Sequence, residues 1–598
     1  MNLFEFTTDG FRIIQLIMTI SVFLISSLFS LEYFKFDKKI TLKFLAITAF
    51  VFASVVGVFL SATLLSLFVC FEIMSISSYL WVIFEKTEKA RSASMLYLVV
   101  SLVTGMVTLV GVVLLNNYLG TTNISEMLDI VNQMSDKTAV YVAAGLTFVG
   151  FFAKAGLYPL HIWMADAYTF SPAPATAMLS SVLSKAGVFG VIVVASNIFL
   201  HNEQFGEILI IFALLTMIWG GFCATNSQNL KTIMAFSSMS QLGFVFLGIA
   251  MQAIMGEENL IAINGTTLHM LNHSVFKLIL FTLSGVCAIV FGSANLEDIK
   301  GIGRKNKIVG FAFTISGLGL AGMPFLSGYV SKTLLHESIV EEIAASGSSL
   351  YAVYEILFLF AGALTASYVI KVLFAVFSSP KDTSKVKLSP LCNICLILPC
   401  LFVVAMGIMP NLIADSIAYF GSDIMHAEHT DAHAVSYFTY ENIKGALISL
   451  GGGVIIYFVV IKMVFKEIGN NIRVPHFLKI TTLCMNFYKV LMFIFKIYIT
   501  VTAKLVDAFL ELLVSFGMRP SKTRDITKTV VVSYEIGEKI DKTFSKLHIK
   551  HDNSYANDLS EFEKKSVLRR RMIAASLSYG LLISGLGTIS VLIYLMFA

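Results

Sequence analysis

The sequence predicts an all-α polytopic membrane protein with about 14 transmembrane helices. Two observations support this class. Of the 598 residues, 57% are hydrophobic and only 14% are charged, and the mean hydropathy is +0.81. Apolar runs long enough to cross a bilayer also recur along the chain. The net charge of +5 is small, and it gives no indication that the protein binds nucleic acid.

Hydropathy places the expected spans, and the first of them lacks the features of a cleaved signal peptide. No basic n-region and no small-residue cleavage site accompany it, so we expect it to be retained. The expected spans are residues 11–31, 42–60, 62–84, 93–115, 139–157, 174–198, 206–223, 230–251, 261–291, 308–334, 351–378, 389–409, 443–462 and 572–597.

Positive charge in the loops predicts the orientation of the chain. Lysine and arginine cluster after odd-numbered spans and are almost absent after even-numbered ones, apart from Lys137 and Lys444. Because cytoplasmic loops carry the excess of basic residues, we expect the N-terminus to lie outside. The basic loop residues are Lys35, Lys38, Lys39, Lys43, Lys86, Lys89, Arg91, Lys300, Arg304, Lys305, Lys307, Lys381, Lys385, Lys387, Lys462, Lys466 and Arg473.

The C-terminal part of the chain differs from the rest. Between Pro475 and residue 568, charged residues interrupt apolar ones at helical spacing, which predicts a lateral amphipathic helix along the membrane surface. The span at 572–597 would anchor it. The alternative is a further span at 481–501 followed by a soluble tail, which Lys489 and Lys496 disfavour.

Two predicted spans contain a proline break, and this indicates an internal repeat. Pro159 interrupts the fifth span and Pro324 the tenth. Two five-helix units offset by an odd number of spans have opposite topology, and inverted repeats with broken helices are a transporter design. The expected domains are therefore 1–41 as an N-terminal span, 42–198 and 206–378 as inverted repeats, 389–462 as two further spans, 475–568 as the lateral helix and 572–597 as the anchor.

One expected helix, residues 261–291, carries the most informative pattern. His269, His273 and Lys277 recur every fourth residue, so they share one helical face and drift by only about 40° per step. Lipid would penalise this face, which must therefore meet protein or water. Three stacked titratable groups predict a proton relay. A polar stripe that holds helices together is the alternative.

Other ionisable residues also interrupt the apolar spans. Each costs at least ~2.5 kcal/mol at the centre of a helix in lipid, so a series of them indicates a function. Desolvation makes a buried lysine a proton acceptor near neutral pH, whereas a nearby carboxylate favours its charged form. A Glu–Lys pair can therefore load and release a proton. The residues concerned are Glu72, Lys154, Lys185, Lys231, Lys332 and Lys371.

No residues in the sequence form a recognisable cofactor or metal site. Cys392 and Cys395 have CxxC spacing, but no second pair or flanking histidine completes a zinc or iron–sulfur set, so we expect a structural role. His426, His429 and His433 are expected to lie in a solvated outer loop, with a metal site as the alternative. Phosphate-loop, dinucleotide and nucleophile motifs are absent, so no cofactor is expected in this chain.

Together these motifs resemble one family. The chain is similar to the antiporter-like, ion-translocating subunits of respiratory complex I, with relatives in membrane-bound hydrogenases and in multisubunit cation/proton antiporters. The resemblance covers residues 42–380. It rests on the segment around Glu72, on Lys154–Pro174, on Ser237–Gly243, on the His269, His273 and Lys277 helix, and on Gly328–Lys332.

The resemblance implies a role for each matching position. Glu72 would tune the proton affinity of Lys154, which would receive a proton from the cytoplasmic side. The other implied roles are a lysine of the following helix at Lys185, a central relay at His269, His273 and Lys277, and a terminal lysine near the exit at Lys332. Lys231 joins this expected proton-translocation set as a buried charge. The lysine at the terminal position, with the long C-terminal region, resembles distal members that carry a lateral helix.

These inferences predict a subunit that conducts protons, or Na⁺, within a redox-driven pump in a prokaryotic plasma membrane. Its partners would be other membrane subunits, contacted through the lateral helix, and peripheral subunits holding iron–sulfur, flavin or nickel–iron centres. The alternatives are a subunit of a multisubunit Na⁺/H⁺ antiporter and an inactive scaffold, which the intact Glu, Lys and His positions disfavour. Members of the family usually have about two more N-terminal spans than this chain.

Overall fold

The computed structural model describes residues 4–256, 259–380, 385–427 and 435–459. The chain divides into two compact units, Met1–Asn471 and Ile472–Ala598, and every described residue belongs to the first. The expected lateral helix at 475–568 and anchor span at 572–597 lie outside the described residues.

The described residues form helices joined by short loops. The longer helices are α1 Gly10–Tyr33, α2 Lys38–Leu60, α3 Leu64–Val82, α4 Glu88–Leu119, α5 Ile124–Gln133, α6 Thr138–Ala155, α9 Ser184–Ile198, α10 Glu203–Asn226, α11 Leu230–Ile254, α12 Leu260–Phe291, α14 Lys307–Ala321, α15 Ser327–Ser346, α16 Ser349–Phe377, α17 Pro390–Ile408 and α19 Tyr440–Ile455. The shorter ones are η1 Leu160–Trp163, α7 Met164–Phe170, α8 Ala173–Met178, η2 Leu179–Leu183, α13 Ile302–Lys305, η4 Pro410–Ala414, α18 Asp415–Phe420 and η5 Asp423–Met425.

The expected class is confirmed, since the described residues contain 12 helical runs long and apolar enough to cross a membrane. The α14 helix is a shorter apolar helix that continues through a break into α15. The expected count of about 14 spans is not established, because the last expected span lies in the part of the chain that is not described.

Polar side chains fix where the helices begin. Asp37 caps α2 by accepting hydrogen bonds from the backbone N–H groups of Lys39 and Ile40, at 2.8 and 3.0 Å. Thr63 caps α3 and Asn306 caps α14 in the same way. These caps satisfy backbone donors that have no partner within the helix, and they place the start of each span next to a polar loop.

Glycine ends the two helices whose breaks the sequence predicts. Gly156 follows α6 with φ of 76°, and Gly322 follows α14 with φ of 86°. This left-handed conformation is accessible to glycine at no steric cost. Pro159 and Pro324 lie in the connections that follow, and the chain resumes as η1 and α7 in one case and as α15 in the other. The structure thus contains a broken helix in each expected five-helix unit.

Two differences from the hydropathy-based spans concern polar helices. The tenth span was expected to end at residue 334, but α15 continues to Ser346. Glu337, Glu341 and Glu342 lower the local hydropathy there without interrupting the helix. The short helix α5 was not expected, because its ten residues are too few and too polar to resemble a span.

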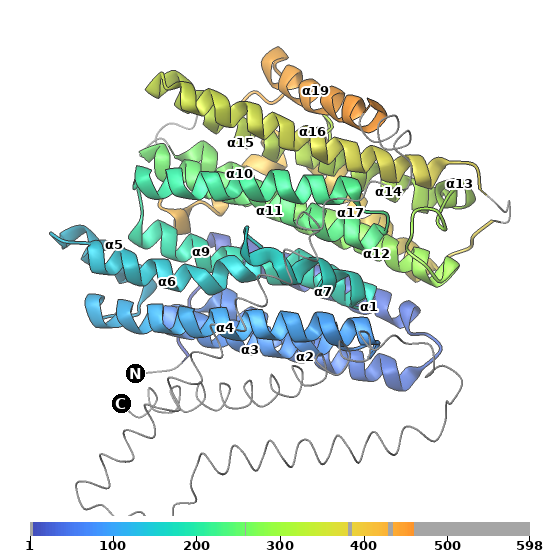
Figure 1. Cartoon of the computed structure of the whole chain (residues 1–598), viewed down its shortest axis with the longest axis horizontal. Helices are drawn as coiled ribbons and strands as arrows, with labels where there is room; N and C mark the ends of the chain where they lie inside the picture. The colour runs from blue at the N-terminus through green and yellow to red at the C-terminus, as the bar shows by residue number, and fades with distance from the viewer. Residues whose placement is uncertain (1–3, 257–258, 381–384, 428–434, 460–598) are drawn as a thin grey trace, which may run out of the picture. The chain divides into compact units, whose positions relative to one another are not determined.

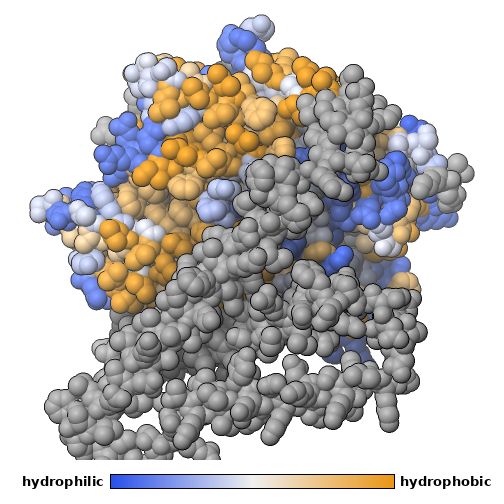
Figure 2. Space-filling model, viewed as in Figure 1, coloured by the Kyte–Doolittle hydropathy of each residue, from blue (hydrophilic) through white to orange (hydrophobic). Residues whose placement is uncertain are grey.

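Within the first unit the helices run side by side, from α2, α3 and α4 at one edge to α16 and α19 at the other (Figure 1). The central helices α9 and α11 are almost entirely buried, whereas α19 is mostly exposed. Figure 2 shows hydrophobic side chains gathered between hydrophilic margins that coincide with the helix ends. This distribution fits a bundle whose flank meets lipid and whose ends meet water.

Candidate functional site

The first buried cluster lies between α3, α4 and α6. Lys154 is 3% exposed and Glu72 is 7% exposed. The Lys154 amine donates to Ser75 Oγ at 3.0 Å and to the hydroxyl of Tyr97, and Tyr97 in turn shares a hydrogen bond with Ser78. No ion pair joins the two predicted partners, Glu72 and Lys154, although both are described. The Lys154 amine is therefore hydrogen-bonded to hydroxyl groups, and the Glu72 carboxylate lies on a neighbouring helix.

Glycine at position 105 of α4 makes room for the Glu72 carboxylate. A Cβ atom added to Gly105 would lie 2.2 Å from Glu72 Oε1, closer than any van der Waals contact. That oxygen is buried and has no hydrogen-bond partner among the described residues. The side chain of Glu72 is therefore positioned by packing rather than by a hydrogen bond.

We expect the substitution Gly105→Ala to displace the Glu72 carboxylate and so to slow any transport that depends on this group. Overpacking a buried site costs about 1–3 kcal/mol, and a shift of 1.4 kcal/mol changes a rate about tenfold. The transport rate should therefore fall by roughly tenfold at unchanged protein level, measured in membrane vesicles with a pH-sensitive dye. Gly145→Ala is the matched control, since a Cβ there meets nothing within 4 Å. Equal rates for the two variants would contradict this account.

A second contact joins the two expected repeats. The Lys185 amine of α9 lies 2.8 Å from His273 Nδ1 of α12 and donates to the backbone oxygen of Ser180 at 2.7 Å. Ser180 belongs to η2, a π-helical turn, and such turns shift backbone carbonyls out of the regular α-helical pattern. Lys185 and His273 are both fully buried, so this contact lies deep within the bundle.

The next lysine along α12 bonds to α11. Lys277 donates to Ser237 Oγ at 2.7 Å and to the backbone oxygen of Met234 at 3.1 Å. Ser237 Oγ lies 2.8 Å from the hydroxyl of Tyr368 on α16. A hydroxyl can both donate and accept, so Ser237 and Tyr368 extend the polar contacts from Lys277 toward α16.

His269 extends the polar contacts in the opposite direction along α12. Its Nδ1 lies 3.0 Å from Ser331 Oγ of α15, and Asn272 donates to the same hydroxyl at 3.1 Å. The Nε2 atoms of His269 and His273 are buried without a partner among the described residues.

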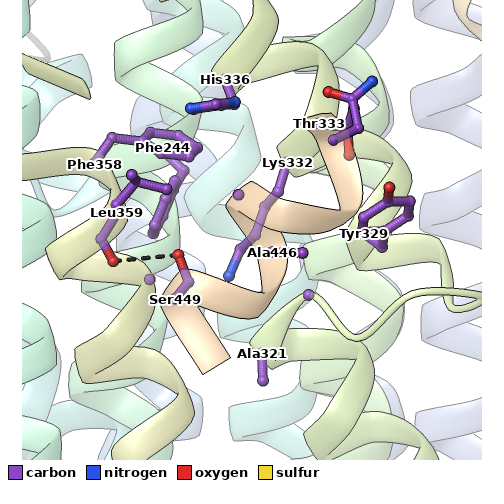
Figure 3. Close-up of a pocket in the computed structure, with 14 residues that line it drawn as sticks. Phe244, Ala321, Tyr329, Lys332, Thr333, His336, Phe358, Leu359, Ala446 and Ser449 are labelled. Atoms are coloured by element: carbon purple, nitrogen blue, oxygen red, sulfur yellow. Dashed lines mark hydrogen bonds between the residues drawn. The ribbon is translucent and has the colours of Figure 1, made fainter. Parts of the chain in front are cut away.

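The final lysine of the predicted set lines a cavity. Lys332 donates to the backbone oxygen of Leu320 at 2.9 Å, and its amine lies 4.8 Å from the centre of the Phe244 ring. It is half-buried, because part of its surface faces a cavity of about 40 Å³ between α15, α16 and α19 (Figure 3). A cavity of this size can hold water.

Two other buried lysines bond to backbone oxygens. Lys371 donates to the oxygens of Ala224, Thr225 and Ser227, which are the terminal carbonyls of α10 and the residue after it. Lysine satisfies such unpaired carbonyls well, so Lys371 has a sufficient structural explanation. Lys231, at the start of α11, donates to the backbone oxygen of Ser171. This contact involves neither His269 nor His273.

The predicted residues thus fall into local groups, and among the described residues Lys185 and His273 are the two that contact each other directly. We use "polar row" for the seven residues Glu72, Lys154, Lys185, His273, Lys277, His269 and Lys332. Serine and tyrosine hydroxyls connect several members of the row to neighbouring helices. The residues that the sequence did not single out are Ser75, Tyr97, Ser180, Asn272 and Tyr368, of which Ser75 and Asn272 also lie within segments that the resemblance identified. Ser237 and Ser331 lie within segments that the resemblance identified, yet isolated serines carry little signal.

Among the described residues, the cysteines and histidines outside the polar row form no potential metal-binding cluster. Cys392 and Cys395 are free and buried, and no group of three or more potential metal ligands occurs among the described residues. His426 Nε2 lies 3.2 Å from Asn197 Oδ1, and burial lowers the pKa of this imidazole. The other two histidines of the predicted outer loop, His429 and His433, lie outside the described residues.

Comparison with known proteins identifies sequence relatives. Residues 61–358 match the family described as NADH:quinone oxidoreductase/Mrp antiporter, TM. A Na⁺/H⁺ antiporter subunit of Alkalihalophilus pseudofirmus is 31% identical over 287 residues, which are 48% of this chain and 57% of the relative. The corresponding antiporter subunit of Bacillus subtilis is 28% identical over 289 residues, with the same two coverages. The match thus spans little more than half the length of these relatives.

Two solved structures share the fold. A chain of the Mrp complex from Dietzia sp. DQ12-45-1b superposes with a TM-score of 0.62 and 21% identity, over 70% of this chain and 84% of its own length. A chain of the membrane-bound sulfane sulfur reductase, an archaeal respiratory membrane complex, also gives 0.62, with 25% identity, over 70% and 82%. The helical architecture is thus common to an Mrp complex and a respiratory complex.

Proposed function

Through residues 61–358 the chain belongs to the NADH:quinone oxidoreductase/Mrp antiporter transmembrane family, and from this premise we propose that it translocates protons as a membrane subunit of a redox-driven pump. Lys154 receives a proton from the cytoplasmic side under the influence of Glu72. Lys185, His273, Lys277 and His269 pass it along the bundle. Lys332 then releases it toward the outer face, as the last member of the polar row.

The contact between Lys185 and His273 carries this proposal. An amine and an imidazole nitrogen 2.8 Å apart exchange a proton readily, since both are titratable and share a hydrogen bond. The contact spans α9 and α12, which belong to different expected repeats. A stripe that only held helices together would be served by neutral hydroxyls or amides, without the cost of burying several cationic groups.

The chain itself would supply the path and not the energy. Moving one charge against 100 mV requires ~2.3 kcal/mol, and the sequence carries no recognisable redox site. We therefore propose that peripheral redox subunits drive the pump through neighbouring membrane subunits. The basic loops support our proposal that the N-terminus lies outside and that the location is a prokaryotic plasma membrane. Lys231 is proposed to act near the cytoplasmic access to the polar row. Pro159 and Pro324 are proposed to maintain the helix breaks that follow Lys154 and precede Lys332, respectively.

A second function is favoured by a specific observation. The Alkalihalophilus and Bacillus relatives are both Na⁺/H⁺ antiporter subunits. The chain would then exchange Na⁺ for protons with small membrane subunits as partners and without a redox enzyme. The polar row fits either function, because both need a proton path through the bundle.

Purification from the native membrane separates the two functions. We expect the chain, extracted with a mild detergent and analysed by mass spectrometry, to bring with it subunits that hold iron–sulfur or other redox centres. The copurified complex should also acidify vesicles when its electron donor is added. If only small membrane subunits accompany the chain and Na⁺ alone drives proton movement, the redox proposal is wrong and the antiporter function holds.

A further inference from the structure

We propose that His336 and Glu355 form a proton-release pair, which takes protons from the Lys332 cavity and delivers them to the outer surface. This inference rests on the proposed function and extends it beyond Lys332, the last residue of the predicted path. It assigns a role to two residues that neither the sequence motifs nor the resemblance singled out.

Helical spacing places the pair next to the end of the polar row. His336 follows Lys332 by four residues on α15, so the two side chains lie on one face, one turn apart. Both line the same cavity, and Figure 3 shows them on the same side of α15, with Phe244 and Phe358 alongside. Water in the cavity would bridge the amine and the imidazole, as such sites commonly do.

The pair provides a step from the interior to the surface. His336 Nε2 lies 3.0 Å from Glu355 Oε1, and the side chains are 15% and 31% exposed, respectively. Exposure therefore rises from the buried His269 through His336 to Glu355. Both residues lie between Lys332 and the connection from α15 to α16, which faces outward in the orientation predicted by the basic loops.

The chemistry of the two groups suits release. Imidazole has two ring nitrogens, so it can accept a proton on one of them and give up a proton from the other. A carboxylate beside it accepts the hydrogen bond and meets solvent. The cavity itself is lined mainly by apolar side chains and glycines, including Ala321, Gly362 and Ala446. Among the titratable groups that line it, His336 is the one in contact with a partly exposed carboxylate, that of Glu355.

The opposing explanation is that the pair only holds α15 against α16. Partly exposed ion pairs contribute little to stability, typically about 0–1 kcal/mol. The same end of α16 already has a structural contact of this kind, because Tyr351 and Tyr354 both donate to Glu207 of α10, at 2.8 and 2.9 Å. This neighbouring contact does not line the cavity and provides a matched control.

The test compares proton transport by the intact complex in native membrane vesicles. His336→Gln preserves a hydrogen-bond donor toward Glu355 but cannot carry a proton. We expect its transport rate to fall by about 100-fold, the low end of what removing a proton-transfer group does, with unchanged amounts of assembled complex. Glu355→Gln should lower the rate in the same direction, whereas Tyr354→Phe should leave it at the wild-type value.

Each possible result supports or overturns the proposed release pair. If His336→Gln and Glu355→Gln both transport at the wild-type rate while Lys154→Ala is inactive, the release pair is wrong and the proposed function stands. If Lys154→Ala is also fully active, the proposed function itself fails. If His336→Gln does not assemble, Glu355→Gln decides alone, because its amide still contacts His336. Equal losses in Tyr354→Phe and His336→Gln would reduce the pair to a structural contact.

Discussion

Replacement of Lys154 by alanine is expected to abolish proton transport while the complex still assembles. Lys154 is the buried amine at the start of the polar row, and its hydrogen-bond partners are the hydroxyls of Ser75 and Tyr97. These hydroxyls can hydrogen-bond to each other or to water once the amine is gone, and no ion-pair contact with Glu72 is broken, so we expect the bundle to keep its packing. Removal of a proton-transfer group lowers a rate by roughly 100-fold or more.

The measurement uses everted native-membrane vesicles and a fluorescent pH indicator. Acidification is followed after addition of an electron donor, and in a parallel sample after a Na⁺ pulse, so that either coupling mode is detected. Lys89→Ala is the control, since this exposed lysine lies at the start of α4 and takes no part in the polar row. Undiminished acidification by Lys154→Ala, at normal levels of the complex, would remove Lys154 from the path.

The second large effect is expected for His273→Gln. Glutamine can still accept a hydrogen bond from Lys185 across the 2.8 Å contact, so the packing between α9 and α12 is preserved. It does not titrate, so the contact can no longer pass a proton. We expect the transport rate to fall by roughly 100-fold, while the thermal midpoint of the purified complex changes little.

The control for this variant lies one position along the same helix. Ser274 donates to the backbone oxygen of Met270 within α12, so Ser274→Ala removes a local hydrogen bond at similar burial. We expect its transport to match the wild type. A loss of transport in both variants, or in neither, would mean that the histidine is not a specific proton carrier.

Local sequence patterns were sufficient to predict most of the helices and to predict which ionisable side chains share a helical face. The face shared by His269 and His273 follows from helical geometry alone, and the helix breaks follow from the glycine and proline residues near 156 and 322. The helix α15 extends beyond the expected end of the span at residue 334, because hydropathy measures the preference of a segment for lipid and not its tendency to be helical. Glutamate residues beyond Lys332 reduce that preference although they are good helix formers.

Contacts between helices could not be predicted from these patterns. That Lys185 meets His273 depends on how α9 crosses α12. That Lys154 bonds to Ser75 and Tyr97 rather than to Glu72 depends on how closely α3, α4 and α6 approach one another. Gly105 permits the closest approach, but the sequence gives no indication that the Glu72 carboxylate is the group opposite it.

By itself, the sequence determined that this is a helical membrane protein, which helices carry buried charge, and which charged residues share a face. These properties are local, since they follow from the 3.6-residue period and from the cost of placing charge in lipid. The tertiary structure alone decided which of those charges touch, which hydroxyls connect them, and that His336 and Glu355 meet beside the Lys332 cavity. Such contacts join residues far apart in the chain, and only the packing of whole helices brings them within hydrogen-bond distance.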